Sequence, residues 1–316
     1  MYRIILAILL LHIIMYAKNI KPVAVIKTSG LVSDFVVDGN LLYAATDEGS
    51  IDIIDIVQQK VVDQIKFKPL RTAIGISVPT RIFSVDRFQG KTLIVSSADH
   101  AYRNVWIHDG KKLRKIIDSK EKVMAKRALF IDENLTFMGT FGSDVILYNK
   151  SDTYQNYTEH ISYNAMGGIA LNESKKKAAV GDEGGTVRII DVATSNIDLV
   201  LNSENRDNIY RVAFRNNIVI TASQDMRVGV YLVDDNRSYH IKSDFLVYCV
   251  GMSISGKTGI YSSGYDHELQ LFDIKTSKKG DRLIGHNAIV NKIVFVDEKS
   301  IVSAGDERNI FFWVID

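Results

Sequence analysis

The sequence repeats one short pattern at a nearly constant step, and this repetition limits the possible fold more than any other feature. Small residues precede an acidic or glycine-containing turn, which leads into an alternating apolar strand, as in AVGDEGGTVRIID (179–191). The strands of the seven copies end at Asp55, Asp109, Asn149, Asp191, Leu232, Asp273 and Val314. The successive steps are therefore 54, 40, 42, 41, 41 and 41 residues. Such a regular step predicts one structural unit that is used seven times.

Each unit contains about four short apolar runs with the alternation of a β-strand. The final unit shows them as RLIG, IVNKIVFV, SIVSAG and NIFFWV. A lone four-stranded sheet cannot cover both of its faces, whereas sheets packed radially around an axis cover one another. The sequence therefore predicts an all-β, seven-bladed β-propeller.

The two ends of the chain predict how this ring closes. The last unit stops at residue 316 after three strands, and the strand VAVIKT (23–28) near the start has no unit of its own. Pairing this strand as the outer strand of the seventh blade satisfies backbone groups that are otherwise exposed at an edge. Deletion of residues 22–28 should then lower the melting temperature sharply.

Residues 1–17 (MYRIILAILLLHIIMYA) have the composition of a secretory signal peptide. Arg3 precedes an apolar run from Ile4 to Met15, and small Ala17 follows it. The run is shorter than the ~20 residues that a membrane-spanning helix needs. An uncleaved anchor is the alternative. We expect an exported, periplasmic protein in which residues 18–316 form the propeller.

The repeats resemble the WD-repeat family of seven-bladed propellers. The last unit carries the strongest likeness, with Gly285-His286 at its start and Trp313 at the end of a strand. In that family the His is linked by hydrogen bonds to a turn Asp, a strand Ser or Thr, and the Trp. The turn position here is Glu307, while Asp225 and Asp266 match the turn Asp in two earlier blades. The resemblance implies structural roles for His286, Glu307, Trp313, Asp225 and Asp266.

Departures from the constant repeat length indicate a candidate binding surface. The first interval has two extra pieces around blade two, KPLRTAIGISVPTR (68–81) and the hairpin turn ADHAYRNV (98–105). In WD-like rings these two kinds of connection emerge on the same face, and loops on a rigid scaffold commonly carry binding functions. Neutral surface insertions are the alternative. The candidate partner-binding residues are Arg71, Arg81, Asp99, His100, Tyr102 and Arg103.

A basic run, KKLRKIIDSKEKVMAKR (111–127), has two interpretations. It forms either an electropositive patch for an acidic partner or anionic membrane surface, or a set of solvated strand positions. The chain as a whole carries a formal charge of only +2, which gives no reason to expect a nucleic-acid partner.

The sequence offers no catalytic, metal-binding or cofactor-binding motif. Its single cysteine, Cys249, excludes a disulfide framework and a cysteine metal cluster. The glycine-rich GDEGG (181–185) lies at a turn between strands and lacks the lysine of a phosphate-binding loop. The innermost strands are mainly apolar, which argues against a channel lined by metal-binding carboxylates. We therefore expect a non-enzymatic protein without cofactors, and a lactonase-like hydrolase or ligand-binding propeller with a channel site is the alternative.

A finer resemblance concerns blades two and three. The segments RIFSVD (81–86), YRNVWIHD (102–109) and ALFIDEN (128–134) look like the WD-repeat accessory proteins of periplasmic nitrate reductases, the NapL family. This resemblance implies a scaffold that acts in assembly, maturation or electron delivery. Its partners would be the nitrate reductase or the redox partners of that enzyme, without stable membrane insertion.

Overall fold

A computed structural model describes residues 17–72, 74–99, 102–149 and 154–316 of the protein. The predicted signal peptide (1–17) lies outside this part of the chain except for Ala17, and so does His100. Within the described residues, no helix combines the length and the apolar character that a bilayer-spanning segment needs.

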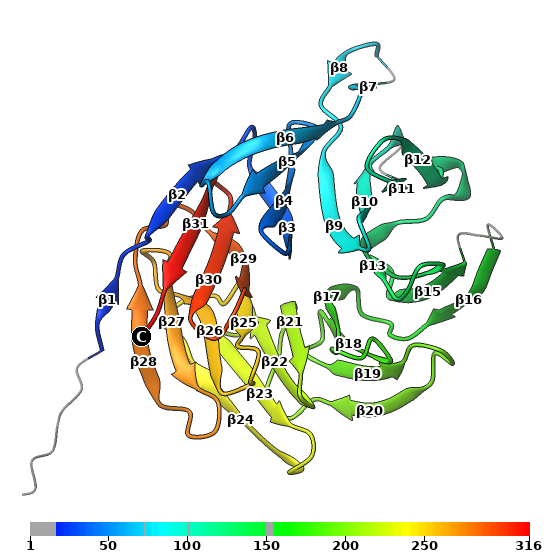
Figure 1. Ribbon diagram of the computed structural model, residues 1–316. Helices are drawn as coiled ribbons and strands as arrows, with labels where there is room; N and C mark the ends of the chain where they lie inside the picture. The colour runs from blue at the N-terminus through cyan, green and yellow to red at the C-terminus, as the bar shows by residue number, and fades with distance from the viewer. Residues whose placement is uncertain (1–16, 73, 100–101, 150–153) are drawn as a thin grey trace, which may run out of the picture.

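Seven antiparallel sheets are arranged around a central axis, as Figure 1 shows. In each blade the first strand of the repeat lies innermost and the later strands of the repeat follow outwards, because each pair is joined by a short hairpin turn. The expected seven-bladed, all-β propeller is confirmed.

The strands of the first four blades follow the predicted repeats. Blade one has β3 (Val32–Asp38), β4 (Leu41–Thr46), β5 (Ser50–Asp55) and β6 (Lys60–Lys66). Blade two has β9 (Ile82–Phe88), β10 (Lys91–Ser97), β11 (Arg103–His108) and β12 (Leu113–Ile117). Blade three has β13 (Ala125–Phe130), β14 (Leu135–Thr140), β15 (Asp144–Asn149) and β16 (Tyr154–His160). Blade four has β17 (Met166–Leu171), β18 (Lys177–Asp182), β19 (Val187–Asp191) and β20 (Ile197–Leu201).

The remaining blades complete the ring. Blade five has β21 (Ile209–Arg215), β22 (Ile218–Ser223), β23 (Arg227–Leu232) and β24 (Arg237–Lys242). Blade six has β25 (Val250–Met252), β26 (Thr258–Ser263), β27 (Glu268–Asp273) and β28 (Lys279–Leu283). Blade seven has β29 (Val290–Phe295), β30 (Ser300–Gly305) and β31 (Asn309–Val314).

The N-terminal segment closes the ring in blade seven. Strand β2 (Ala24–Lys27) pairs antiparallel with β31, from Ala24 opposite Phe312 to Lys27 opposite Asn309. The predicted closure is therefore confirmed. The repeats do not predict the strand that precedes β2. This strand, β1 (Asn19–Ile20), runs parallel to β28 and adds a fifth strand to blade six.

The hydrophobic core is divided among the blade interfaces. In the described residues it forms seven clusters, and each draws its members from two neighbouring blades. At the seam, Ile26 of β2 packs with Phe35 of blade one and Phe312 of blade seven. Each sheet is therefore covered on both faces by its neighbours, which explains why the strands carry apolar residues on both sides.

Candidate functional site

The two insertions of blade two lie beside each other. The first forms a hairpin from β7 (Leu70–Arg71) and β8 (Ser77–Val78), which stands away from the ring between blades one and two (Figure 1). Residues Leu70, Val78, Pro79 and Arg81 of the first insertion share one hollow with Ser97 at the end of β10, with Ala98 of the second insertion, and with Asp47 and Glu48 of blade one. We call residues 68–81 the insertion hairpin.

The insertion hairpin carries apolar side chains into solvent. Ile74 is 81% exposed and Ile76 is 56% exposed. Arg71 is also exposed and lies opposite Ser77 in the hairpin. Exposed isoleucines on a projecting hairpin contribute nothing to a core, and such residues are typical of contacts with another molecule.

The other candidate residues of blade two differ in exposure. Arg81 and Asp99 are exposed, whereas Tyr102 is half-buried and its amide donates to the Asp99 carbonyl at 3.1 Å. The guanidinium of Arg103 lies over the Phe83 ring, 4.1 Å from its centroid. Burial and the nearby charge of Arg81 lower the pKa of Arg103. Arg103 is therefore a packed residue, whereas Arg71 and Arg81 are exposed basic groups.

A row of aromatic residues lies across the ring from the insertion hairpin. Tyr210 stacks on Tyr248 with ring centroids 5.3 Å apart, and Phe245 lies 6.3 Å from Tyr248 and 4.6 Å from Tyr265. Tyr265 is 74% exposed. We call these four residues the aromatic row. Tyr210 lies at the start of β21, Phe245 and Tyr248 lie in the connection between blades five and six, and Tyr265 lies in the turn between β26 and β27. This connection and this turn are the same kinds of loop that carry the insertions, so the aromatic row lies on the same face of the ring.

The polar residues of the last blade form a chain of hydrogen bonds. Trp313 Nε1 donates to Ser303 Oγ at 2.8 Å, and Ser303 Oγ lies 2.7 Å from His286 Nε2. His286 Nδ1 lies 2.7 Å from Glu307 Oε1. A neutral His286 satisfies every partner, since Nδ1 donates to the carboxylate while Nε2 accepts from the hydroxyl. Burial lowers the pKa of His286, which favours this neutral form.

The two earlier turn aspartates differ from each other. Asp225 accepts hydrogen bonds from the amides of Arg206 at 2.8 Å and Arg227 at 3.0 Å, and Asn205 stands in the place of the histidine. Asp266 is exposed on its turn. Blade five therefore keeps a variant of the hydrogen-bonded chain, whereas the Asp266 side chain forms no hydrogen bond within the part of the chain that the structure describes.

The central channel holds charged side chains that the sequence analysis did not select. Six inner strands contain a β-bulge, and the residue after the bulge starts the regular pairing of the strand. At this position stand Asp34, Ser84, Arg127, Gly168, Arg211 and Lys292. Arg127, Arg211 and Lys292 line a cavity of about 410 Å³ along the axis. We call these three residues the channel cations.

Asp34 and Lys292 form an ion pair across the seam between blades one and seven. Asp34 is 2% exposed and also accepts a hydrogen bond from the Val85 amide at 3.0 Å. Burial alone would raise the pKa of Asp34, but Lys292, Arg127 and Arg211 together lower it to about 2. Burial and the two arginines lower the pKa of Lys292 to about 8, against the attraction of Asp34.

The sequence contained a signal for this site. The inner strands are mainly apolar, as predicted, but four of them carry a charged residue directly after the bulge, namely Asp34, Arg127, Arg211 and Lys292. The basic run 111–127 contains residues in two different environments. Lys126 donates to the Met166 carbonyl at 2.6 Å and Arg127 lines the channel, whereas Lys111 and Lys112 are exposed. Alignment of the repeats on the residue after the bulge would have found the channel cations.

The lowered pKa of Lys292 predicts a pH dependence of stability. The ammonium faces Asp34 of β3, Arg127 of β13 and Arg211 of β21, and it lies 5.3 Å from the Phe35 ring centroid. Because its pKa is about 8 in the folded chain and about 10.5 when unfolded, the unfolded chain binds more protons between these values, and stability rises with pH there. Urea unfolding should therefore show Lys292→Met losing this rise between pH 8 and 10. Equal slopes for the two proteins would contradict the assignment.

Comparison with known proteins supports the fold. No protein-family profile matches the chain. The β-propeller domain of Cps50 (Swd1) from Myceliophteria thermophila superposes with a TM-score of 0.74 over 93% of this chain and 99% of that domain, at 14% sequence identity. The chain is a WD-repeat-like seven-bladed β-propeller.

A curated WD-repeat relative adds a sequence match. The chain is 26% identical over 163 residues to actin-interacting protein 1 of Caenorhabditis elegans. The match covers 48% of this chain and 26% of that protein, so this WD-repeat-like propeller spans about a quarter of its relative. The similar solved structure is a β-propeller domain, and a protein-interaction scaffold fits this fold.

Proposed function

We propose that the protein is a non-enzymatic scaffold that binds an exported protein through the face bearing the insertion hairpin and the aromatic row. The insertion hairpin is the observation that carries the proposal, because Ile74 and Ile76 are exposed on a rigid support beside Arg71. Tyrosine and arginine are enriched at the centres of interfaces, where a few residues supply most of the binding energy.

The surface has enough breadth for a specific complex. A standard interface buries about 1,600 Å² in total, and the hairpin and the aromatic row lie on opposite sides of the same ring face. The rigid blades hold both groups in place, so little conformational entropy is lost when a partner binds.

We propose further that the partner belongs to a periplasmic nitrate reductase system, as the likeness of blades two and three to the NapL family implies. The role would be assembly, maturation or electron delivery. This assignment depends on export through residues 1–17. Fractionation of producing cells, followed by mass spectrometry of the N-terminus, tests it, and a cytoplasmic protein that retains Met1 would contradict it.

A binding experiment tests the surface itself. Purified periplasmic nitrate reductase is passed over the immobilised propeller. The wild type is compared with two double variants, one with Ile74→Asp and Ile76→Asp and the other with Arg71→Glu and Arg81→Glu. We expect at least about tenfold weaker binding for each pair, since exposed hot-spot residues contribute about 2 kcal/mol or more. Arg237→Glu, on the exposed outer strand of blade five, is the matched control.

The outcomes separate the two parts of the proposal. Binding that both pairs abolish and the control retains supports both parts. No binding to the reductase removes the nitrate assignment. Binding that is unchanged in both pairs contradicts the proposed surface.

The alternative of a hydrolase with a channel site has less support. Among the described residues, no group of three His, Cys, Asp or Glu gathers in a way that could hold a metal ion. The channel position after the bulge instead carries mostly basic or small residues, which suit an anion better than a metal.

A further inference from the structure

The central channel collects more positive than negative charge. Its lining includes the basic residues Arg127, Lys175, Arg211, Arg215 and Lys292, and the acidic residues Asp86 and Glu173. Among the residues that the structure describes, Lys292 is the one channel cation with an ion pair, and its partner is Asp34. Arg127 and Arg211 therefore line the cavity without a direct ion pair to any described residue, although both lie near enough to Asp34 to lower its pKa.

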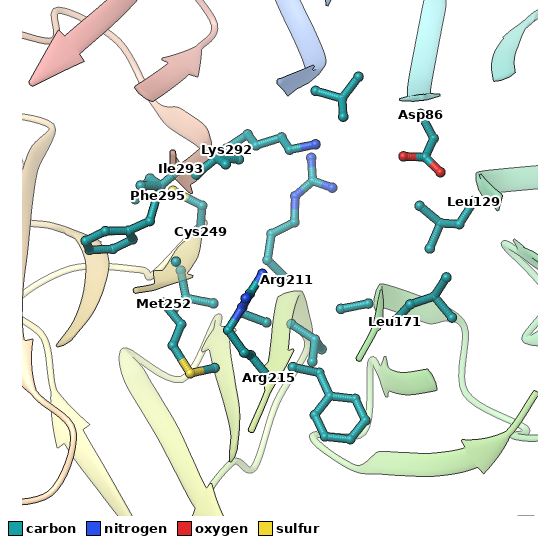
Figure 2. A pocket seen from close by; sticks show the side chains of 18 of the residues that line it. Asp86, Leu129, Leu171, Arg211, Arg215, Cys249, Met252, Lys292, Ile293 and Phe295 are labelled. Carbon is teal, nitrogen blue, oxygen red and sulfur yellow. The ribbon is translucent and has the colours of Figure 1, made fainter. Parts of the chain in front are cut away.

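The channel cations converge from alternate blades. Arg127 comes from blade three, Arg211 from blade five and Lys292 from blade seven, all at the position that follows the bulge. Figure 2 shows the side chains of Arg211 and Lys292 extending toward each other across the cavity. The positive charges of side chains that face one cavity repel one another, because the surrounding protein screens them less than water does.

The hydrogen bonds within the protein leave donor capacity in this cluster. Arg211 Nε donates to the Asn291 carbonyl at 3.1 Å, and an Arg127 terminal nitrogen donates to the Ile169 carbonyl at 3.3 Å. Arg127 Nε is buried and has no hydrogen-bond partner in the described part of the chain. A buried polar atom without a partner costs about 1–3 kcal/mol, more when it is charged.

The nearby acids already have other partners. One oxygen of Asp86 accepts from the Phe130 amide at 2.7 Å, and Glu173 accepts from the Asn216 amide at 3.0 Å. Burial also raises the pKa of Asp86, which weakens its value as a counter-ion. Burial raises the pKa of the Cys249 thiol to about 12, so this wall of the cavity stays neutral.

We propose that the channel binds a small oxyanion, a carboxylate or a phosphate group, between Arg127, Arg211 and Lys292. Guanidinium groups present planar pairs of donors that match the oxygens of such anions, and charge-assisted hydrogen bonds of this kind are strong. The cavity of about 410 Å³ leaves room for a small organic body attached to the anion. The site is separate from the proposed protein-binding face and does not depend on it.

Titration calorimetry with inorganic phosphate, and separately with succinate, tests the site at pH 7 and constant chloride. We expect binding of at least one anion in the millimolar range or tighter, and an affinity at least tenfold weaker for Arg211→Gln. Arg237→Gln, on the outer strand of blade five, should bind like the wild type. Phosphate alone would identify a phosphate site, and succinate alone a carboxylate site.

A second variant keeps the test decisive if Arg211→Gln does not fold. Asp34→Asn removes the competing carboxylate but retains an oxygen that can accept from the Val85 amide. We expect this variant to bind the anion at least about threefold more tightly. A bound anion should also raise the pKa of Lys292, so binding at pH 8 should be accompanied by proton uptake. Calorimetry in buffers of different ionisation enthalpy measures this uptake.

Three results would overturn the proposal. The first is that the wild type binds neither phosphate nor succinate when each is present at 20 mM. The second is equal binding by wild type and folded Arg211→Gln. The third is unchanged or weaker binding by Asp34→Asn, because the anion would then lie away from the channel cations.

Discussion

A chain that starts at Ser29 should melt at least about 10 °C below the full propeller, because it lacks the strand that seals blade seven. Strand β2 supplies the pairing partners of β31 from Asn309 to Phe312. Without it, β31 becomes an exposed edge, and Ile26 leaves the interface between blades one and seven. Differential scanning calorimetry measures the loss.

Two controls separate closure from a general effect of truncation. A chain that starts at Lys21 lacks only β1, which lies on blade six outside the seam, and should lose far less. Within β2, Ile26→Asp should unfold the seam, whereas Val25→Asp should be tolerated, because Ile26 is 6% exposed and Val25 is 48% exposed. Equal melting temperatures for the two substitutions would show that β2 is not needed for closure.

His286→Ala should destabilise the protein by about 3–5 kcal/mol, since it leaves two partners of the imidazole unsatisfied, at about 1–3 kcal/mol each, and opens a cavity. The substitution removes the link between Glu307 and Ser303 and opens a cavity beside Trp313. Urea unfolding at pH 7 measures the effect. Trp313→Phe is the matched control, because it removes one hydrogen bond to Ser303 while an aromatic ring stays buried, and should cost about 1–2 kcal/mol.

The same chain of hydrogen bonds should weaken in acid. The pKa of His286 lies below its ordinary value when folded, and burial is the main cause, so protonation opposes folding as the pH falls below about 6.5. The pKa of Glu307 is also lowered, because hydrogen bonds from His286 and Asn309 outweigh burial, so its contribution is lost at still lower pH. A wild-type stability that falls no faster than that of His286→Ala between pH 7 and 5 would contradict the neutral imidazole.

The sequence predicts the ring because its information is repeated. A step near 41 residues and period-2 alternation are local signals, and seven copies of a sheet that is apolar on both faces have few ways to cover themselves other than a closed propeller. The same reasoning places VAVIKT (23–28) at the seam, since an edge of blade seven needs a partner. The position of the two blade-two insertions also follows from a departure in the step.

Other features depended on the third dimension. The likeness to the WD-repeat family identified the positions of His286 and Trp313, but only the structure shows that Glu307 completes their hydrogen bonds. The apolar tip of the insertion hairpin was not selected, because exposure of Ile74 and Ile76 cannot be seen in a sequence where isoleucine normally indicates a core. The aromatic row combines Tyr210 of β21 with residues of two loops, and Tyr210 and Tyr265 are far apart in the chain.

The sequence by itself determined the repeated blades, their number and the strand that joins the two ends, because each of these follows from spacing and alternation along the chain. The tertiary structure alone decided what faces the axis. A bulge changes which side of a strand each residue occupies, and it turns Arg127, Arg211 and Lys292 from separate blades toward one cavity. Their charges act on one another only because the closed ring holds them close together.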